Sequence, residues 1–486
     1  MRRCLFTVGL VFAVALVPDP VCSQVPDPAM TERIKEEGLD RSQALDLFHT
    51  LTDVYGARLT GSPAYTAAAE WARGRFEDWG LSDPRLEPFE FGRGWTLEKL
   101  SVEMVSPRYL PLIATADAWT PSVDGVVHGP VLYVGDRAAS EIGAMADQLR
   151  GAIVLTHQSQ TEFRDSDRPQ PGLGDGPVRT GNPPRIPTNS ATPAQEIRAL
   201  LEEAGAAVAM RPTYYRDGTV GGTGSRNTTD EAVPSIVLAA EQYNMLVRLA
   251  QRGITAELRV ELRTAYDDDL QTYNVLADLP GTDPQVADEV VLIGAHLDSW
   301  HTASGATDNG DGSLAVMEAA RILSALDARP RRTIRFALWS GEEQGLLGAR
   351  AYIEGHLSDK AAQDKLQVYL NDDPGSGRSL GFYMEENPRA KAIFDAWLEP
   401  LRDLDVTMNV EAGIGSTDHV PFVRMGLPAF NIIKDFEAYD ERTRHTNADY
   451  PERMTEEELI QQAIFLAHFA WQAAQMDGRI PRVPGS

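Results

Sequence analysis

The most regular pattern of the chain begins near residue 274, where short apolar runs alternate with segments of helical spacing. Three runs are long enough for one buried strand each: 290–293, 333–339 and 366–370. Between them, apolar residues recur every three or four positions and predict helices over 314–326 and 344–355. Buried strands separated by helices are typical of an α/β fold whose sheet is largely parallel at its centre.

The pattern differs in the first half of the chain. Residues 30–80 favour helices, and residues 85–115 are rich in strand-forming side chains. From 119 to 264 the chain consists of short apolar runs, turns and a long polar loop. We therefore expect 119–264 to form a β-rich domain inserted between two parts of a catalytic domain, residues 24–118 and 265–486.

The first 23 residues have the pattern of a signal peptide. Arg2 and Arg3 precede an apolar run over 5–17, which is too short to span a bilayer, and Val21-Cys22-Ser23 resembles a cleavage site. The prediction is export, to the periplasm or the extracellular space; the alternative is a buried N-terminal helix or a retained anchor. No later run approaches about 20 uninterrupted apolar residues, so we expect no membrane span after cleavage.

Cysteine use and charge narrow the chemistry. Both cysteines, Cys4 and Cys22, lie in this leader, so the mature chain would have neither a disulfide nor a thiolate ligand. The 71 acidic and 45 basic residues give a net charge of −26, which excludes a nucleic-acid partner because phosphate contacts require a basic surface. The 486 residues are enough for two or three domains.

Imidazole and carboxylate groups follow the expected strands where each strand ends. These residues are His296 and Asp298 after the first strand, Asp308 before the next helix, Glu342 and Glu343 after the second strand, Asp372 and Asp373 after the third, and His445 and Asp449 near the C-terminus. Alone, each group has an ordinary explanation, such as a surface pair, a helix start or a turn. Together at one rim, the carboxylates would repel one another unless a cation lay between them. Imidazole with carboxylate and no thiolate suits zinc, and also cobalt or manganese.

The run from His296 to Gly348 resembles the co-catalytic dizinc exopeptidases, a family that includes leucyl aminopeptidases, glutamate carboxypeptidase and carboxypeptidase Q. The carboxypeptidase Q branch is the most similar, on His-Leu-Asp-Ser-Trp at 296–300, the twelve-residue step to Asp308, and Glu-Glu-Gln-Gly at 342–345. Val-Pro-Ser-Ile-Val at 233–237 resembles part of a protease-associated domain. The resemblance implies a zinc-exopeptidase three-layer α/β sandwich with a mixed central sheet, plus an inserted β-rich protease-associated domain.

The resemblance also implies a ligand set for two zinc ions per chain. Asp308 would bridge both ions. His296 and Asp373 would complete the shell of one ion, and Glu343 and His445 would complete the other. Such a pair of ions can activate water and stabilise a tetrahedral intermediate.

Further residues are expected around these ligands. Glu342 resembles the general base, which would take a proton from water and pass it to the leaving amine. Asp298 and Asp449 would orient the two histidine ligands through their second ring nitrogens. Asp372 remains an alternative to its neighbour as a ligand, and His419, in a segment more like that of the aminopeptidases, is a candidate for substrate or oxyanion contact.

The function implied is a secreted zinc-dependent exopeptidase that hydrolyses dipeptides or short peptides. A leucyl-type aminopeptidase is one alternative, and a receptor-like binding protein without catalysis is an alternative of another class. A glutaminyl-cyclase-like transferase with one zinc would share the fold. The expected partner is a peptide substrate, with a possible homodimer, and the inserted domain would narrow the site or mediate dimerisation.

Overall fold

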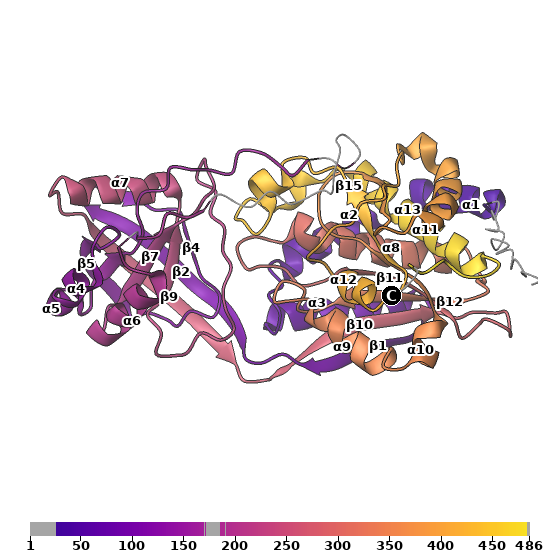
Figure 1. The fold of residues 1–486 in the computed structure, drawn as a ribbon, viewed down its shortest axis with the longest axis horizontal. Helices are drawn as coiled ribbons and strands as arrows, with labels where there is room; N and C mark the ends of the chain where they lie inside the picture. The colour runs from indigo at the N-terminus through magenta and orange to yellow at the C-terminus, as the bar shows by residue number, and fades with distance from the viewer. Residues whose placement is uncertain (1–25, 170, 172–184, 190, 484–486) are drawn as a thin grey trace, which may run out of the picture.

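A computed structural model describes residues 26–169, 171, 185–189 and 191–483. The expected signal peptide and both cysteines lie outside the described residues. The described chain forms two sheets, and the two units built on them lie side by side along the longest axis of the molecule (Figure 1). Within these ranges, no helix combines the length and the apolar character that crossing a bilayer requires.

The first unit is built on a mixed seven-stranded sheet. Its strands are β1 (Ser82–Glu90), β10 (Gln271–Leu279), β11 (Val290–His296), β12 (Thr333–Trp339), β13 (Leu366–Asn371), β14 (Ser379–Tyr383) and β15 (Ala429–Lys434). They are arranged in the order β1-β10-β12-β11-β13-β15-β14. The four central strands, β12, β11, β13 and β15, are parallel, and antiparallel strands complete both edges. The expected mixed α/β fold with a parallel centre is confirmed, because the three apolar runs supply three of the four central strands.

Helices cover both faces of this sheet and make three layers. One face packs against α1 (Pro28–Asp40), α3 (Pro63–Asp78), α8 (Asp311–Ala325), α11 (Pro388–Leu398) and α13 (Glu456–Gln475). The other face packs against α9 (Leu347–His356) and α12 (Val420–Arg424). Short helical segments join these elements: α2 (Ala44–His49), η1 (Thr50–Tyr55), η2 (Ala306–Gly310), α10 (Lys360–Lys365), η3 (Glu399–Leu404), η4 (Tyr439–Thr443) and η5 (Pro451–Arg453).

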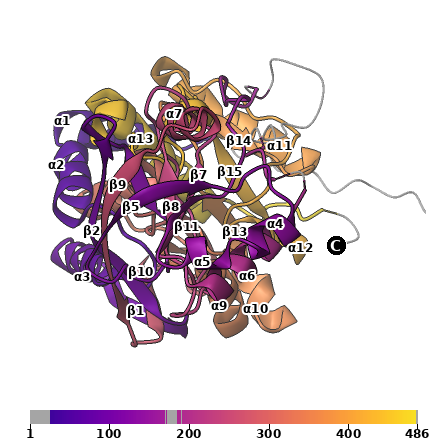
Figure 2. The same cartoon turned by 90° about the vertical axis from the view of Figure 1, so that its left-hand side faces the viewer.

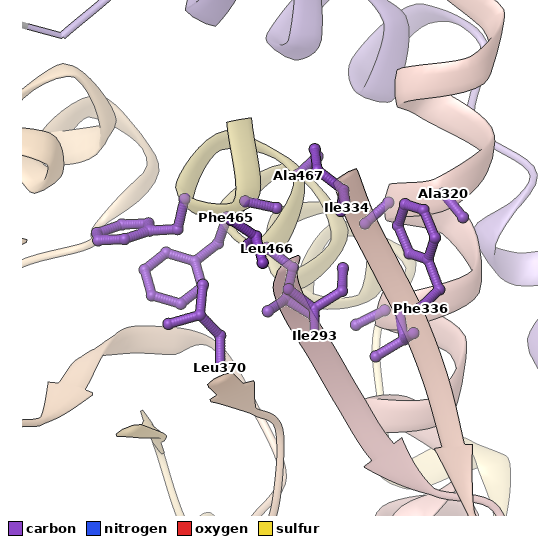
Figure 3. Close-up of a cluster of buried hydrophobic side chains, with 14 of the residues drawn as sticks. Ile293, Ala320, Ile334, Phe336, Leu370, Phe465, Leu466 and Ala467 are labelled. Atoms are coloured by element: carbon purple, nitrogen blue, oxygen red, sulfur yellow. The ribbon is translucent and has the colours of Figure 1, made fainter. Parts of the chain in front are cut away.

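The last long helix, α13, anchors the core of this unit. It begins at a capping box, in which Thr455 Oγ1 accepts a hydrogen bond from Glu458 N at 3.3 Å and the Glu458 carboxylate accepts one from Thr455 N at 2.8 Å. Its side chains Phe465 and Leu466 lie against the sheet beside Ile293 (Figure 3). The cap fixes where the helix starts, and the apolar face then follows at helical spacing.

The second unit is built on an eight-stranded sheet. Its elements are β2 (Gly94–Ser106), β3 (Leu110–Pro111), β4 (Ala114–Ala116), β5 (Val126–Tyr133), α4 (Ala139–Gly143), α5 (Ala146–Leu149), β6 (Ile153–Leu155), α6 (Ala194–Ala204), β7 (Val208–Pro212), β8 (Ser235–Leu238), α7 (Ala240–Gln251) and β9 (Glu257–Asp267). The strand order is β3-β2-β9-β5-β6-β7-β8-β4. Figure 2 views this unit from its free end, with the seven-stranded sheet behind it.

The two units are joined at adjacent points of the chain. Glu90 pairs with Gln271 at the end of the first sheet, and Gly94 pairs with Asp267 at the start of the second. We call residues 94–267 the inserted unit, because the chain enters and leaves it through these neighbouring connections. It starts at 94 rather than at 119, since β2 pairs with β9 along its length, and such non-local pairing is not visible in a local apolar pattern.

Candidate metal centre

The ends of the central strands deliver the predicted ligands to one edge of the seven-stranded sheet. His296 is the last residue of β11, Glu342 and Glu343 follow β12, and Asp373 follows β13. These three strands are parallel neighbours, so their carboxyl ends meet at one edge, where sites of α/β proteins form. His445 arrives from the segment between β15 and α13.

Two groups of three ligands share one carboxylate. His296 Nε2 lies 3.4 Å from Asp308 Oδ1 and 3.7 Å from Asp373 Oδ1. His445 Nε2 lies 3.1 Å from Asp308 Oδ2 and 3.0 Å from Glu343 Oε2. In each group the possible ligand atoms lie within 4.8 Å of one another. Asp308 therefore faces both groups, with a different oxygen toward each histidine.

The chemistry of these side chains fits zinc. Asp373 Oδ1 and Glu343 Oε1 are buried and have no hydrogen-bond partner in the described chain, which is costly for a carboxylate unless a cation is bound. Imidazole nitrogens and carboxylate oxygens, without thiolates, are the ligands of catalytic zinc sites. The five residues expected as ligands are thus brought together, three in each group.

Asp298 supports the centre differently from the expectation. The Nδ1 of His296 bonds to the backbone carbonyl of Asp298 at 2.9 Å, whereas the carboxylate Oδ1 lies 3.7 Å from the same nitrogen. That carboxylate instead accepts hydrogen bonds from the backbone N–H groups of Glu342 and Glu343, at 3.2 and 3.3 Å, and from Thr60 Oγ1 at 3.0 Å. Asp298 therefore orients the histidine through its main chain and the Glu-Glu turn through its side chain.

Asp449 orients Asp308 rather than His445. Its carboxylate accepts hydrogen bonds from Thr307 N at 2.7 Å, Thr307 Oγ1 at 2.8 Å and Asp308 N at 3.2 Å. The expectation that it would hold His445 is wrong, because the nearest donors to this carboxylate belong to the segment that carries Asp308. Sequence proximity to His445 suggested the other partner.

The contacts of Asp372 and Asp373 show which of these two adjacent side chains faces the candidate metal centre. Asp372 Oδ1 lies 2.8 Å from Lys434 Nζ, and the same ammonium lies 2.7 Å from Asp311 Oδ2. All three side chains are fully buried. Asp372 therefore belongs to a buried charge cluster, and Asp373 is the aspartate that faces His296.

A turn after β12 carries Glu342 and Glu343, and it extends into the start of the helix expected over 344–355. The helix predicted over 344–355 starts only at α9, because Gly341, Gly345 and Leu346 have positive φ angles of 70°, 119° and 61°. Glycine adopts this conformation without strain, whereas the local apolar spacing gave no sign of it. The turn points both carboxylates toward the histidines, with Glu342 Oε2 at 4.0 Å from His296 Nε2.

Burial sets the proton affinities of these groups. Burial, and then the nearby charges of Asp373 and Glu343, raise the pKa of Glu342 well above its usual value, against the opposing charge of His296. The pKa of His445 is raised to about 10 by Glu343 and by its hydrogen bonds to Asp308 and Glu343, although burial opposes this. Bound zinc would replace these protons as the positive charge of the centre.

The ligand groups open into a cleft of about 370 Å³, a volume in the range of small-molecule sites. The cleft is lined by Arg168, Asp308, Glu342, Glu343, Gly345, Leu346, Arg350, Asp373, Pro374, Gly415, Ser416, Val420, Arg424, Tyr439, Arg444 and His445. His419 does not line it: the ring is fully buried, and Nε2 lies 3.0 Å from Glu385 Oε1. The structure gives His419 a supporting position behind the cleft wall.

Two supporting residues were missed in the sequence. Trp300 Nε1 donates a hydrogen bond to Glu343 Oε2 at 2.7 Å. The buried guanidinium of Arg58 donates to three carbonyls of the segment that leads to Asp308, those of Leu297, Ser304 and Gly305, at 2.7 to 2.8 Å. Trp300 is the last residue of the 296–300 motif that carries the family resemblance, and this motif was the one sequence signal for it.

Comparison with known proteins relates this chain to peptidases. Residues 274–470 match the family described as Peptidase family M28. Carboxypeptidase Q of Mus musculus is 26% identical over 450 residues, which cover 92% of this chain and 88% of that protein.

Two solved structures share the fold. A peptidase M28 precursor from Shewanella amazonensis has a TM-score of 0.70 and 24% identity, and the match covers 94% of this chain and 99% of that one. A zinc aminopeptidase from Bacillus subtilis has a TM-score of 0.58 and 19% identity, and the match covers 89% of this chain and 94% of that one. The chain is therefore a metallopeptidase, and its residues 274–470, which carry the candidate centre, match peptidase family M28.

Proposed function

We propose that the protein is a two-zinc exopeptidase that hydrolyses dipeptides or short peptides in the manner of carboxypeptidase Q. The observation that carries this proposal is the pair of ligand groups that share Asp308 in a cleft that also exposes Glu342. Similarity to carboxypeptidase Q along 92% of the chain supports the choice of substrate class.

Each ligand has a defined role in this proposal. His296 and Asp373 would hold one zinc, Glu343 and His445 would hold the other, and Asp308 would contact both. When bound, zinc supplies Lewis-acid chemistry: it lowers the pKa of water and polarises a peptide carbonyl. The burial of His296, Asp308 and Asp373 limits competition from solvent and strengthens the electrostatic interactions inside the cleft, whereas the His445 side chain is 20% exposed.

Glu342 is the proposed general base. Its carboxylate would accept a proton from the water whose oxygen bonds to the peptide carbonyl carbon. The same carboxyl group would then give that proton to the amine nitrogen as the carbon–nitrogen bond breaks. The position of Glu342 supports this role, because its carboxylate lines the cleft and Oε2 lies 4.0 Å from Nε2 of the proposed ligand His296.

A leucyl-type aminopeptidase is the second candidate. Gly415 and Ser416, from the segment that is more like that of the aminopeptidases, line the cleft. A zinc aminopeptidase has a similar fold, so the architecture of this chain is compatible with aminopeptidase activity. The two candidates differ in which end of the substrate must be free.

Blocked dipeptides separate these candidates. The zinc-loaded protein would be assayed on an unblocked dipeptide, its N-acetylated form and its C-amidated form, with Glu342→Gln as the inactive control. Cleavage of the unblocked dipeptide alone supports the proposed dipeptidase, and cleavage of the amidated form as well supports the aminopeptidase. No turnover of any form by protein with two bound zinc ions contradicts both and favours a non-catalytic binding protein.

We also propose that residues 1–23 direct export and are then removed. The charged start, short apolar run and small residues at 21–23 support this. N-terminal sequencing of the exported protein should begin at Gln24. A retained Met1 would contradict the proposal.

The inserted unit is proposed to be a protease-associated domain, with a homodimer as the assembly. Its β-rich composition and the residues 233–237 support the first point. Light scattering of the purified protein should give twice the chain mass of 53.2 kDa. A mass of one chain at micromolar concentration would contradict the dimer.

A further inference from the structure

The two ligand groups depend on different parts of the molecule. His296 is the last residue of β11 and Asp373 comes shortly after β13, so the seven-stranded sheet places both residues. Glu343 and His445 are different, because each is held by a contact that leads into the inserted unit. These contacts differ in chemistry and come from separate segments, so they are independent observations.

Trp300 links Glu343 to the core of the inserted unit. Its indole N–H donates to Glu343 Oε2 at 2.7 Å. Its ring is packed in the hydrophobic cluster of the inserted unit, 6.4 Å from the ring centre of Trp119. The next residue, His301, bonds through Nε2 to the carbonyl of Ala116 at 2.8 Å. The position of one zinc ligand is thus tied to side chains of the second sheet.

The segment between β7 and β8 holds the backbone of His445. The N–H of Gly222 donates to the His445 carbonyl at 3.1 Å, and the hydroxyl of Tyr215 donates to the Arg444 carbonyl at 2.9 Å. Gly221 forms an antiparallel bridge with Thr446. The residue they surround has a φ of 58°, a conformation that is unfavourable for a non-glycine residue and needs support from its neighbours.

Two glycines of the inserted unit, Gly221 and Gly222, lie where a Cβ atom would meet neighbouring side chains. A Cβ atom at Gly221 would lie 2.7 Å from Cε2 of Tyr215, and one at Gly222 would lie 2.6 Å from Cγ2 of Thr302. Both distances are too short for real contacts. The clash at Gly221 is with a side chain of the inserted unit itself, and the clash at Gly222 is with a side chain of the segment that follows Trp300.

A second loop of the inserted unit, between β6 and α6, holds the other side of the same segment. Arg168 makes a bidentate ion pair with Asp440, with Nε at 2.5 Å from Oδ2 and Nη2 at 2.7 Å from Oδ1. Both side chains are buried, at 2% and 3% exposure. The Asp167 carboxylate accepts hydrogen bonds from the N–H groups of Ala438 and Glu441, at 2.6 and 2.9 Å. These bonds fix η4, the turn that leads into His445.

We propose that the inserted unit positions Glu343 and His445, so that it sets the zinc affinity of their site but not that of the His296–Asp373 site. Trp300 and Arg168 are positioning residues in this arrangement, acting through one ligand each. The inference rests on the proposed two-zinc centre. It assigns the inserted unit a part in building the centre, beyond narrowing the cleft or mediating a dimer.

In the first test, zinc is titrated into the metal-free Trp300→Phe protein, and binding is measured by calorimetry. This change removes the indole donor to Glu343 and keeps an aromatic ring. We expect one of the two binding events to weaken about tenfold or more, as is typical when a partner of a ligand is lost, and the other to change less than about twofold. Trp95→Phe is the matched control, because Trp95 lies in the same cluster and donates to the Thr120 carbonyl instead.

Arg168→Gln tests the second link with its own control. Arg335→Gln breaks a similar bidentate pair with Asp278, both bonds 2.7 Å long, between strands β10 and β12. Arg168→Gln should weaken the same binding event as Trp300→Phe, whereas Arg335→Gln should weaken neither. If circular dichroism shows that Arg168→Gln does not fold, the comparison of Trp300→Phe with Trp95→Phe tests the inference by itself.

The His445→Ala variant shows which of the two zinc-binding events Trp300→Phe weakens. In His445→Ala, the site near the inserted unit is already lost, so adding Trp300→Phe should leave the remaining event unchanged. Equal weakening of both events, or wild-type titrations for Trp300→Phe, would overturn the inference. These readouts do not require turnover, so a failure of the proposed peptidase activity would appear separately, as intact zinc binding without cleavage.

Discussion

At the scale of single residues, we expect the two aspartates after β13 to have different roles, one in metal binding and the other in stability. Asp373 faces His296, and Asp372 neutralises the buried ammonium of Lys434 together with Asp311. We expect Asp373→Asn to lose zinc with little change in the stability of the metal-free protein. Asp372→Asn should keep both zinc ions and lower the free energy of unfolding by about 1–3 kcal/mol, since its buried ion pair with Lys434 is lost.

Zinc analysis and urea denaturation of the metal-free forms check both expectations. Loss of zinc in Asp372→Asn but not in Asp373→Asn would reverse the assignment of the ligand.

Glu342 is expected to act on the chemical step alone. Replacing it with glutamine removes the proton acceptor and keeps the size of the side chain, so kcat should fall by about 10²–10⁴ while the zinc content stays the same. Glu354→Gln, the same change on the exposed side of α9, should leave kcat unchanged. Steady-state kinetics on an unblocked dipeptide measure both. A Glu342→Gln protein with normal kcat would rule out the proposed base.

At the scale of elements, the agreement between sequence and structure depends on how local the cause is. The strands at 290–293, 333–339 and 366–370 are continuous apolar runs, and buried parallel strands need little else. The start of α9 was placed too early, because a turn with three positive φ angles intervenes, and its shape serves the orientation of Glu342 and Glu343. The membership of β2 in the second sheet depends on its pairing with β9, which lies more than 150 positions away in the chain.

The same distinction holds for the centre. The five candidate ligands were proposed because their types and spacing along the chain resemble the pattern of a known family, and the structure brings them together. The hydrogen-bond partners of Asp449 and His419 could not be predicted from the sequence, because these partners come from segments that are distant along the chain. Asp449 reaches back more than a hundred residues to Thr307, and His419 bonds to Glu385 instead of facing the cleft.

The start of α13 offers a prediction at the scale of this one element. Thr455→Ala removes the side-chain oxygen that accepts from Glu458 N, so it should cost about 1 kcal/mol of stability. For a unit of this size, that corresponds to a fall in Tm of about 2–4 °C. Thr455→Ser keeps the hydroxyl and should unfold like the wild type. Thermal unfolding followed by circular dichroism compares the three, and equal Tm values would show that the cap contributes nothing.

At the scale of the whole molecule, the centre lies where the two units meet. The first sheet supplies the ligands at its strand ends, and loops of the inserted unit pack against the segment that carries His445. The chain has a net charge of −26. Four of its carboxylates, those of Asp308, Glu342, Glu343 and Asp373, lie together in the cleft at one edge of the seven-stranded sheet. Their mutual repulsion without a cation couples metal binding to the stability of the fold.

Removal of zinc should therefore destabilise the folded protein measurably. Zinc binds the assembled centre far better than the unfolded chain, so each site occupied at about 100 times its Kd adds about 2.7 kcal/mol to the free energy of unfolding. We expect dialysis against a chelator to lower Tm in calorimetry and added zinc to restore it. Magnesium should not restore it, because it prefers oxygen ligands in octahedral geometry and the centre contains two imidazoles. Chelator already saturated with zinc controls for other effects of the reagent. Identical thermograms with and without zinc would mean that these buried carboxylates are compensated by protons alone, and the two-zinc centre would have to be abandoned.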